Sequence, residues 1–139
     1  MKEKINIFLF TYGSLMSEMR LNHLLLEKGA IFCGQGKTIE TFEFYDLGKY
    51  PGIVKNISGK QIIGEVWAIN NSTLELLDLI EGIPTLFKRN IAKITVESKT
   101  INCFYYELAS EAKKESSRKL EVNSWREVWT KIVNEREES

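Results

Sequence analysis

Two acidic residues, Asp78 and Glu81, lie three positions apart in the segment LELLDLIEGIP. This spacing places both carboxylates on one side of a short helix, in its last turn. Negative charge at that end opposes the helix dipole by roughly 0.3–1 kcal/mol for each carboxylate, and like charges at this spacing repel. The pattern leaves two interpretations open: two solvated carboxylates, or a carboxylate whose raised pKa makes it an acid or base near neutral pH.

A short turn, Tyr12-Gly13-Ser14-Leu15, follows an apolar run at residues 5–10. Gly13 allows backbone conformations that other residues rarely adopt. A strand that ends in a tight turn at the start of a helix leaves several backbone N–H groups unpaired and pointing one way. Such a nest attracts a carboxylate or an oxyanion. Four residues are a weak motif, so a simple connecting turn remains the alternative.

The remaining reactive side chains limit the possible mechanisms. The single histidine, His23, lies in a helical pattern and is interpreted as a surface or half-buried helix residue. A Ser-His-Asp or Cys-His arrangement would have to use it, and a metal site would have little else but carboxylates as ligands. Cys33 and Cys103 lack metal-type spacing, so we expect reduced, packed thiols. Acid–base chemistry would belong to a carboxylate, with no metal and no cofactor.

The composition is that of an ordinary soluble globular chain. Of 139 residues, 43% are apolar and 27% are charged, and 19 basic residues balance 19 acidic ones. The neutral balance gives no support for a nucleic-acid partner. The first apolar run is far shorter than the roughly 20 residues of a membrane span, and no cleavage site follows it. We therefore expect a cytoplasmic monomer or homodimer without a membrane or nucleic-acid partner.

The predicted elements place the turn at the end of a strand. Residues 5–10 form a central strand that is apolar on both faces. A helix capped by Ser17 and ended by Gly29 follows. Further extended segments are expected at residues 31–46, with a bulge near Gly34 and Gly36, at 50–54 and at 62–69.

A second helix is expected to carry the two carboxylates. Ser72 and Glu75 fit a capping box at its start. Gly82 sits where a left-handed cap would end the helix, and Pro84 prevents it from resuming. Alternating residues at 90–97 and 101–108 then form a hairpin across residues 98–100. Strands with helices inserted between them, without regular βαβ alternation, favour an α+β fold.

The chain divides into a domain of residues 1–110 and a segment of residues 111–139. Residues 110–119 are polar and charged and form the expected linker. A C-terminal amphipathic helix follows, with one apolar stripe formed by Trp125, Trp129, Ile132 and Val133. The stripe either packs on the same domain or forms a partner or dimer face.

Five segments, in this order, give the chain a resemblance to the γ-glutamylcyclotransferase-like family: FTYGSL, YPGIV, GEVWAI, LLDLIEGIPTLFKRNIAKI and CFYYEL. They cover about residues 6–108 at roughly the family's spacing. The segment from Glu81 to Arg89 is most similar to the γ-glutamylamine cyclotransferase branch and its bacterial relatives. The resemblance implies a small mixed β-barrel with flanking helices, to which this chain adds the C-terminal helix.

The resemblance also implies roles for individual residues. The family's catalytic acid falls on Glu81. The substrate-binding positions fall on Tyr12, Gly13, Ser14, Leu15 and Tyr106. Asp78 matches an Asp that is expected to be structural. Arg89 matches the Arg that follows the motif and is expected to be a supporting residue.

Three departures from the family pattern concern the leaving group more than the reaction. Phe87 stands where these relatives often have Tyr, so that hydroxyl is absent. The segment MSEMRLN after the turn lacks the Gly usual in the γ-glutamylamine branch. The chain beyond about residue 110 has no counterpart in the resemblance.

The implied reaction is the cyclisation of a small γ-glutamyl amide. The α-amino group attacks the γ-carbonyl carbon, and 5-oxoproline and an amine are released, with Glu81 as general acid and base and with no metal or covalent intermediate. Two alternatives remain: a non-catalytic module that binds γ-glutamyl or pyroglutamyl groups, and an interaction protein that uses the Trp125/Trp129 helix. Turnover tests the first alternative, and truncation of the tail tests the second.

Overall fold

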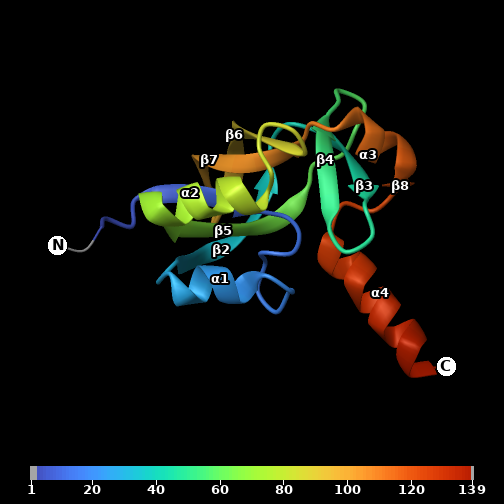
Figure 1. The fold of residues 1–139 in the computed structure, drawn as a ribbon, viewed down its shortest axis with the longest axis horizontal. Helices are drawn as coiled ribbons and strands as arrows, with labels where there is room; N and C mark the ends of the chain where they lie inside the picture. Colours follow the sequence, from blue (N-terminus) through green and yellow to red (C-terminus); the bar gives the residue numbers. More distant parts are fainter. Residues whose placement is uncertain (1–2, 139) are drawn as a thin grey trace.

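The computed structural model describes residues 3–138 and is built around a closed five-stranded barrel (Figure 1). The strands follow the order β1 (Ile7–Thr11), β5 (Ile63–Ile69), β2 (Ile31–Thr38), β6 (Phe87–Val96) and β7 (Lys99–Leu108). Neighbouring strands are antiparallel, except that β1 and β7 are parallel where the barrel closes. The predicted α+β class with a small mixed barrel is confirmed.

A second sheet lies beside the barrel and contains β4 (Pro51–Lys55), β3 (Phe42–Asp46) and β8 (Arg118–Leu120), in this order. The helix α3 (Glu111–Ser116) precedes β8, so a helix and a strand stand where the sequence predicted a polar linker. Three residues, two of them basic, are too few to produce a strand pattern, and pairing with β3 is what makes them extended. The division at residue 110 stays a prediction.

The strands β1 and β5 contribute buried side chains on both of their faces. Successive residues of β1 and β5 enter different apolar clusters: Phe10 and Val66 join one, whereas Leu9 and Trp67 join the other. Side chains alternate across a strand, so each strand serves both clusters. The first cluster continues into the second sheet and the C-terminal helix, and the second lies under α1 and α2. This confirms that the first strand is apolar on both faces.

The first helix, α1 (Asn22–Glu27), begins later than the sequence predicted. Ser17 does not cap it, because residues 13–21 form a loop held by its own backbone hydrogen bonds. The helix begins after Leu21 without a side-chain cap. Gly29, at φ +75°, follows the end of the helix as predicted.

The second helix, α2 (Asn71–Ile80), is capped by Asn70, whose side chain accepts a hydrogen bond from the Thr73 N–H at 2.8 Å. The predicted capping box was therefore misplaced. Ser72 donates to Glu3 instead, and Glu75 accepts from Asn71. Asn and Ser are about equally good caps, so two candidates only two positions apart could not be ranked from the sequence.

The C-terminal helix, α4 (Trp125–Glu138), begins against the second sheet and then runs away from the barrel (Figure 1). Trp125 is 2% exposed and its ring lies 6.5 Å from that of Phe44, edge to face. Val128 is also buried, whereas Trp129 is 39% exposed. The predicted apolar stripe is thus divided between a packed first turn and a more exposed continuation.

The hairpin between β6 and β7 has a two-residue turn. The β6–β7 turn consists of Glu97 and Ser98, both at positive φ, which is one residue earlier than predicted. Positive φ at both central residues is the geometry that two-residue hairpins favour.

None of the helices in the described part of the chain is long and apolar enough to cross a membrane.

Candidate active site

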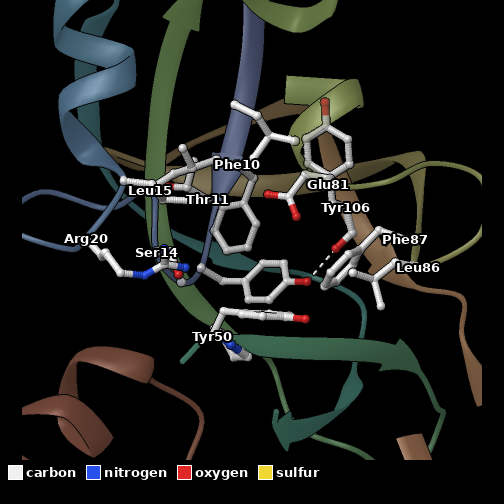
Figure 2. Close-up of a pocket in the computed structure, with 15 residues that line it drawn as sticks. Phe10, Thr11, Ser14, Leu15, Arg20, Tyr50, Glu81, Leu86, Phe87 and Tyr106 are labelled. Atoms are coloured by element: carbon white, nitrogen blue, oxygen red, sulfur yellow. Dashed lines mark hydrogen bonds between the residues drawn. The ribbon is translucent and has the colours of Figure 1, made fainter. Parts of the chain in front are cut away.

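A cavity of about 290 Å³ opens where the turn after β1, the start of β4 and the end of α2 meet (Figure 2). Six of the residues predicted from the sequence line it: Tyr12, Gly13, Ser14, Leu15, Glu81 and Tyr106. The other two predicted residues, Asp78 and Arg89, do not. Arg20 and Tyr50, which were not predicted, also contribute to the lining.

Glu81 closes the C-terminal end of α2, and Gly82 directs the chain away from it. Gly82 has φ +65°, donates its N–H to the Leu79 carbonyl, and is followed by a bond from the Ile83 N–H to the Asp78 carbonyl. This is the Schellman arrangement, for which glycine is strongly favoured. The predicted left-handed end of the helix is confirmed, and it fixes where the Glu81 side chain begins.

The Glu81 carboxylate points into the cavity (Figure 2) and makes no hydrogen bond to any residue that the structure describes. Burial raises the pKa of Glu81 to about 7, while the nearby Arg20 guanidinium works in the opposite direction. A carboxyl group with this pKa exists in both protonation states at neutral pH. It is therefore chemically able to accept a proton and to return it.

Asp78 does not line the cavity, and its carboxylate is paired with two other side chains. It accepts a hydrogen bond from the Tyr106 hydroxyl at 2.7 Å and forms an ion pair with Arg89. The Arg89 guanidinium also lies 5.0 Å from the centre of the Phe104 ring. The repulsion expected between two neighbouring carboxylates is thus not what raises the pKa of Glu81. Asp78 instead ties the end of α2 to β6 and β7.

Gly13 is required for a different reason from the one predicted. Its φ does not lie in the left-handed region, but a Cβ atom added there would lie 2.6 Å from the Cδ atom of Pro51. Real Cβ atoms essentially never approach so closely. The turn therefore packs against the start of β4, and only glycine permits that approach.

The turn that lines the cavity contains hydrogen-bond donors without partners among the described residues. The backbone N–H groups of residues 13, 14 and 15 donate to no residue in the described range. The Ser14 hydroxyl is buried and likewise has no partner among residues 3–138. Buried polar groups are normally paired, so this group of free donors could receive an anionic group of a ligand.

Tyr12 anchors the turn on its other side. Its hydroxyl donates to the Tyr106 carbonyl of β7. Burial raises the pKa of Tyr12 well above its usual value, and the negative charge of Glu81 adds to this effect. The hydroxyl therefore remains protonated and serves as a donor that joins the turn to the barrel.

The loop after the turn brings Arg20 to the cavity. The Leu21 N–H donates to the Ser14 carbonyl at 2.8 Å, and the Asn22 side chain donates to the Leu15 carbonyl at 2.9 Å. These bonds fold the chain back, so that Arg20 extends toward Ser14 (Figure 2). In the sequence, this arginine resembles any exposed residue of a helix, because the bonds that place it belong to the loop.

A buried carboxylate, Glu65 of β5, forms a hydrogen bond with the same loop. It accepts the Ser17 N–H at 2.7 Å and the Trp67 indole N–H at 3.2 Å. Arg126 of α4 donates to Glu65 at 3.2 Å and to the Ser17 carbonyl at 2.7 Å. The loop beside the cavity is thereby bonded to both the barrel and the C-terminal helix. Sequence reasoning missed this link because its members are far apart in the chain.

No cluster of three or more His, Cys, Asp or Glu side chains with the geometry of a metal site occurs within the described residues. His23 is exposed on α1 and lies outside the cavity.

Comparisons with known proteins identify the family of the chain. The sequence profile of the family described as "Gamma-glutamyl cyclotransferase, AIG2-like" matches residues 9–127, which extends beyond the segments that carried the resemblance. A protein of Methanocaldococcus jannaschii, provisionally named as a gamma-glutamylcyclotransferase, is 34% identical over 71% of this chain and 82% of its own length. The gamma-glutamylaminecyclotransferase of Rattus norvegicus is 26% identical over 75% of this chain and 79% of its own.

The fold is also similar to that of solved structures. An AIG2-like protein from Mus musculus superposes with a TM-score of 0.72 at 24% identity, covering 78% of this chain and 80% of that one. The profile match covers well over half of the chain. On this evidence the protein belongs to the gamma-glutamyl cyclotransferase, AIG2-like family.

Proposed function

We propose that this protein is a γ-glutamylcyclotransferase that converts a small γ-glutamyl amide into 5-oxoproline and a free amine. The observation that carries the proposal is the position of Glu81: an unbonded carboxylate with a pKa of about 7 that faces a turn of free donors across one cavity. The names of the archaeal and rat relatives support the same reaction class.

The reaction needs only one proton carrier. The α-amino nitrogen of the substrate attacks its own γ-carbonyl carbon, which forms one C–N bond and closes a five-membered ring. The bond between that carbon and the leaving nitrogen then breaks. Starting from the ammonium form, the attacking nitrogen gives up two protons in turn and the departing nitrogen gains two, leaving as an ammonium ion, so that no water or other reactant is consumed.

Glu81 fits both transfers. At neutral pH its ionised form takes a proton from the α-amino group, and the resulting carboxylic acid gives it to the leaving nitrogen. A general acid–base group typically contributes about 10²- to 10⁴-fold to the rate. Its pKa of about 7 suits both directions, since a much stronger acid would be a poor base and a much weaker acid a poor donor.

The turn and the cavity account for the rest of the acceleration. The free N–H groups of residues 13–15 suit the α-carboxylate or the oxyanion that develops on the γ-carbonyl. A cavity of about 290 Å³ is at the small end of the range for ligand sites. It favours a bent substrate whose nitrogen and γ-carbon are already close, which is a near-attack geometry.

The proposal is tested by incubating the protein with a panel of γ-glutamyl compounds and measuring 5-oxoproline by mass spectrometry. The panel contains γ-glutamyl amino acids and γ-glutamyl alkylamines, so that it also identifies the leaving amine. N-acetylated versions are the controls, because acetylation removes the attacking amine and should stop the reaction. Binding of these compounds without 5-oxoproline release would reject the enzyme and favour a γ-glutamyl-binding module.

A further inference from the structure

The cavity has walls of opposite hydrogen-bonding character. One side carries hydrogen-bond donors: the Ser14 hydroxyl, the free N–H groups of residues 13–15 and the Arg20 guanidinium. On the other side lies the Glu81 carboxylate, which accepts when ionised (Figure 2). Such a cavity suits a ligand that carries an anionic and a cationic group close together.

Arg20 is available to a ligand. It is exposed, it lines the cavity, and it forms no ion pair with the acidic side chains that the structure describes. The bond from the Leu21 N–H to the Ser14 carbonyl holds it beside the Ser14 hydroxyl. Its charge also reaches Glu81, because it lowers the pKa that burial raises. Arg20 and Glu81 thus act on the same small volume.

We propose that Arg20, together with the Ser14 hydroxyl, binds the α-carboxylate of the γ-glutamyl substrate and makes the enzyme selective for substrates in which that carboxylate is free. This inference rests on the proposed function and specifies its substrate class. An α-amino acid carries its carboxylate and its ammonium group on one carbon, so a guanidinium and a carboxylate on opposite walls hold both groups at once. The ammonium group is then directed at Glu81, which must take its proton.

The test combines a change in the enzyme with a matching change in the substrate. Arg20→Gln and wild type are compared on a γ-glutamyl alkylamide with a free α-carboxylate and on the same compound with that group converted to a carboxamide. Arg20→Gln should lose about 10- to 100-fold in kcat/KM on the free acid, mainly through KM, as expected when a charge-assisted hydrogen bond is lost. On the carboxamide Arg20→Gln should lose a much smaller factor, because no anion is present for the arginine to bind and only the effect of Arg20 on the pKa of Glu81 remains.

Two control variants complete the experiment. Arg20→Lys keeps the charge and should recover most of the lost activity on the free acid. Lys28→Gln removes an exposed positive charge at the end of α1, outside the cavity, and should leave kcat/KM unchanged. An equal loss for Arg20→Gln on both substrates, or no loss on either, would overturn the assignment. So would a loss confined to substrates whose leaving amine carries a carboxylate, because Arg20 would then bind that group instead.

A binding measurement separates this inference from the proposed reaction. The product 5-oxoproline keeps the α-carboxylate, and 5-oxoprolinamide lacks it. Calorimetry should show that wild type prefers 5-oxoproline by about 10-fold or more and that Arg20→Gln loses this preference. If wild type shows the preference but releases no 5-oxoproline from any γ-glutamyl compound, the reaction is rejected and the carboxylate site stands. If wild type binds both compounds equally, or neither, the site is rejected.

Discussion

Glu81 owes its chemistry to its position at the end of a helix. Neither the helix dipole nor burial favours a negative charge there, and the residue has no hydrogen-bonding partner in the described chain that would stabilise its ionised form. A group kept in such a place at a cost to stability is a candidate for function. This cost can be measured independently of any substrate.

The pH dependence of stability should report the pKa of Glu81. The folded protein keeps the Glu81 proton up to about pH 7, whereas the unfolded chain loses it near pH 4.5. Stability therefore falls as the pH rises from about 4.5 to 7. Glu81→Gln removes this loss, so the variant should gain on wild type across that window, by about 2–3 kcal/mol in total.

Urea denaturation of both proteins between pH 4.5 and 8 measures this difference. Glu75→Gln, an exposed glutamate of the same helix, is the matched control and should follow wild type throughout. Parallel curves for Glu81→Gln and wild type would show that the pKa of Glu81 is ordinary.

The turn should tolerate no side chain at position 13. The methyl group of Gly13→Ala would collide with the Pro51 ring, so we expect a stability loss of about 1–3 kcal/mol, typical of overpacking, and a raised KM. Chemical denaturation and steady-state kinetics measure the two effects.

Removing the Pro51 ring should restore both the stability and the KM of the Gly13→Ala variant. Pro51→Ala eliminates the two ring atoms nearest to the added methyl group, so the double variant should be less impaired than Gly13→Ala alone. If the second change gives no relief, the close approach to Pro51 is not the reason for glycine at this position.

At the scale of elements, the site is formed by segments that lie far apart in the sequence. Glu81, Gly82 and the Tyr12–Leu15 turn were predictable because each lies in a local pattern of a helix end or a strand end. The loop of residues 13–21 and the contacts of Arg20 and Glu65 could not be predicted, because they depend on hydrogen bonds between parts of the chain that are distant in sequence. Gly13 lines the cavity, but the packing against Pro51 that requires glycine there could not be predicted, because Pro51 is distant in sequence.

The Arg126 link between α4 and the loop should support the site without touching a ligand. Arg126→Met leaves Glu65 with its Ser17 and Trp67 bonds but no cation. Because Arg126 is partly exposed, we expect a loss of about 1–2 kcal/mol in stability. We also expect a several-fold lower kcat/KM, caused by a less ordered loop.

Denaturation and kinetics of Arg126→Met and Arg126→Lys measure this link. The lysine variant retains the charge and should be closer to wild type. Adding Glu65→Gln to Arg126→Met should recover part of the stability, because no unpaired buried charge would remain. Wild-type stability and KM in Arg126→Met would show that α4 does not support the loop.

At the scale of the whole molecule, α4 both completes the core and extends from it. Trp125 is enclosed by the second sheet, whereas Trp129 is more than one third exposed. Trp125→Ala should therefore cost about 3–5 kcal/mol in stability, and Trp129→Ala much less. Chemical denaturation of both variants tests this expectation, and equal losses would contradict it.

Sedimentation of Trp129→Ala tests the alternative role of the helix. If the exposed part of α4 forms a dimer face, the variant should change its association state while the monomer remains stable. An unchanged association state would leave Trp129 as an ordinary, partly packed surface residue.

The whole arrangement converges on one carboxylate: the barrel supplies the cavity, α2 ends at Glu81, and the turn after β1 faces it. Turnover by Glu81→Gln, with 5-oxoproline measured by mass spectrometry, therefore tests the account most directly. The variant keeps the shape of the side chain, so it should bind 5-oxoproline about as well as wild type, while kcat falls by about 10² or more. Glu75→Gln should retain wild-type kcat. If Glu81→Gln cyclises a substrate of the wild-type enzyme at the wild-type rate, Glu81 does not carry the proton and the central claim is wrong.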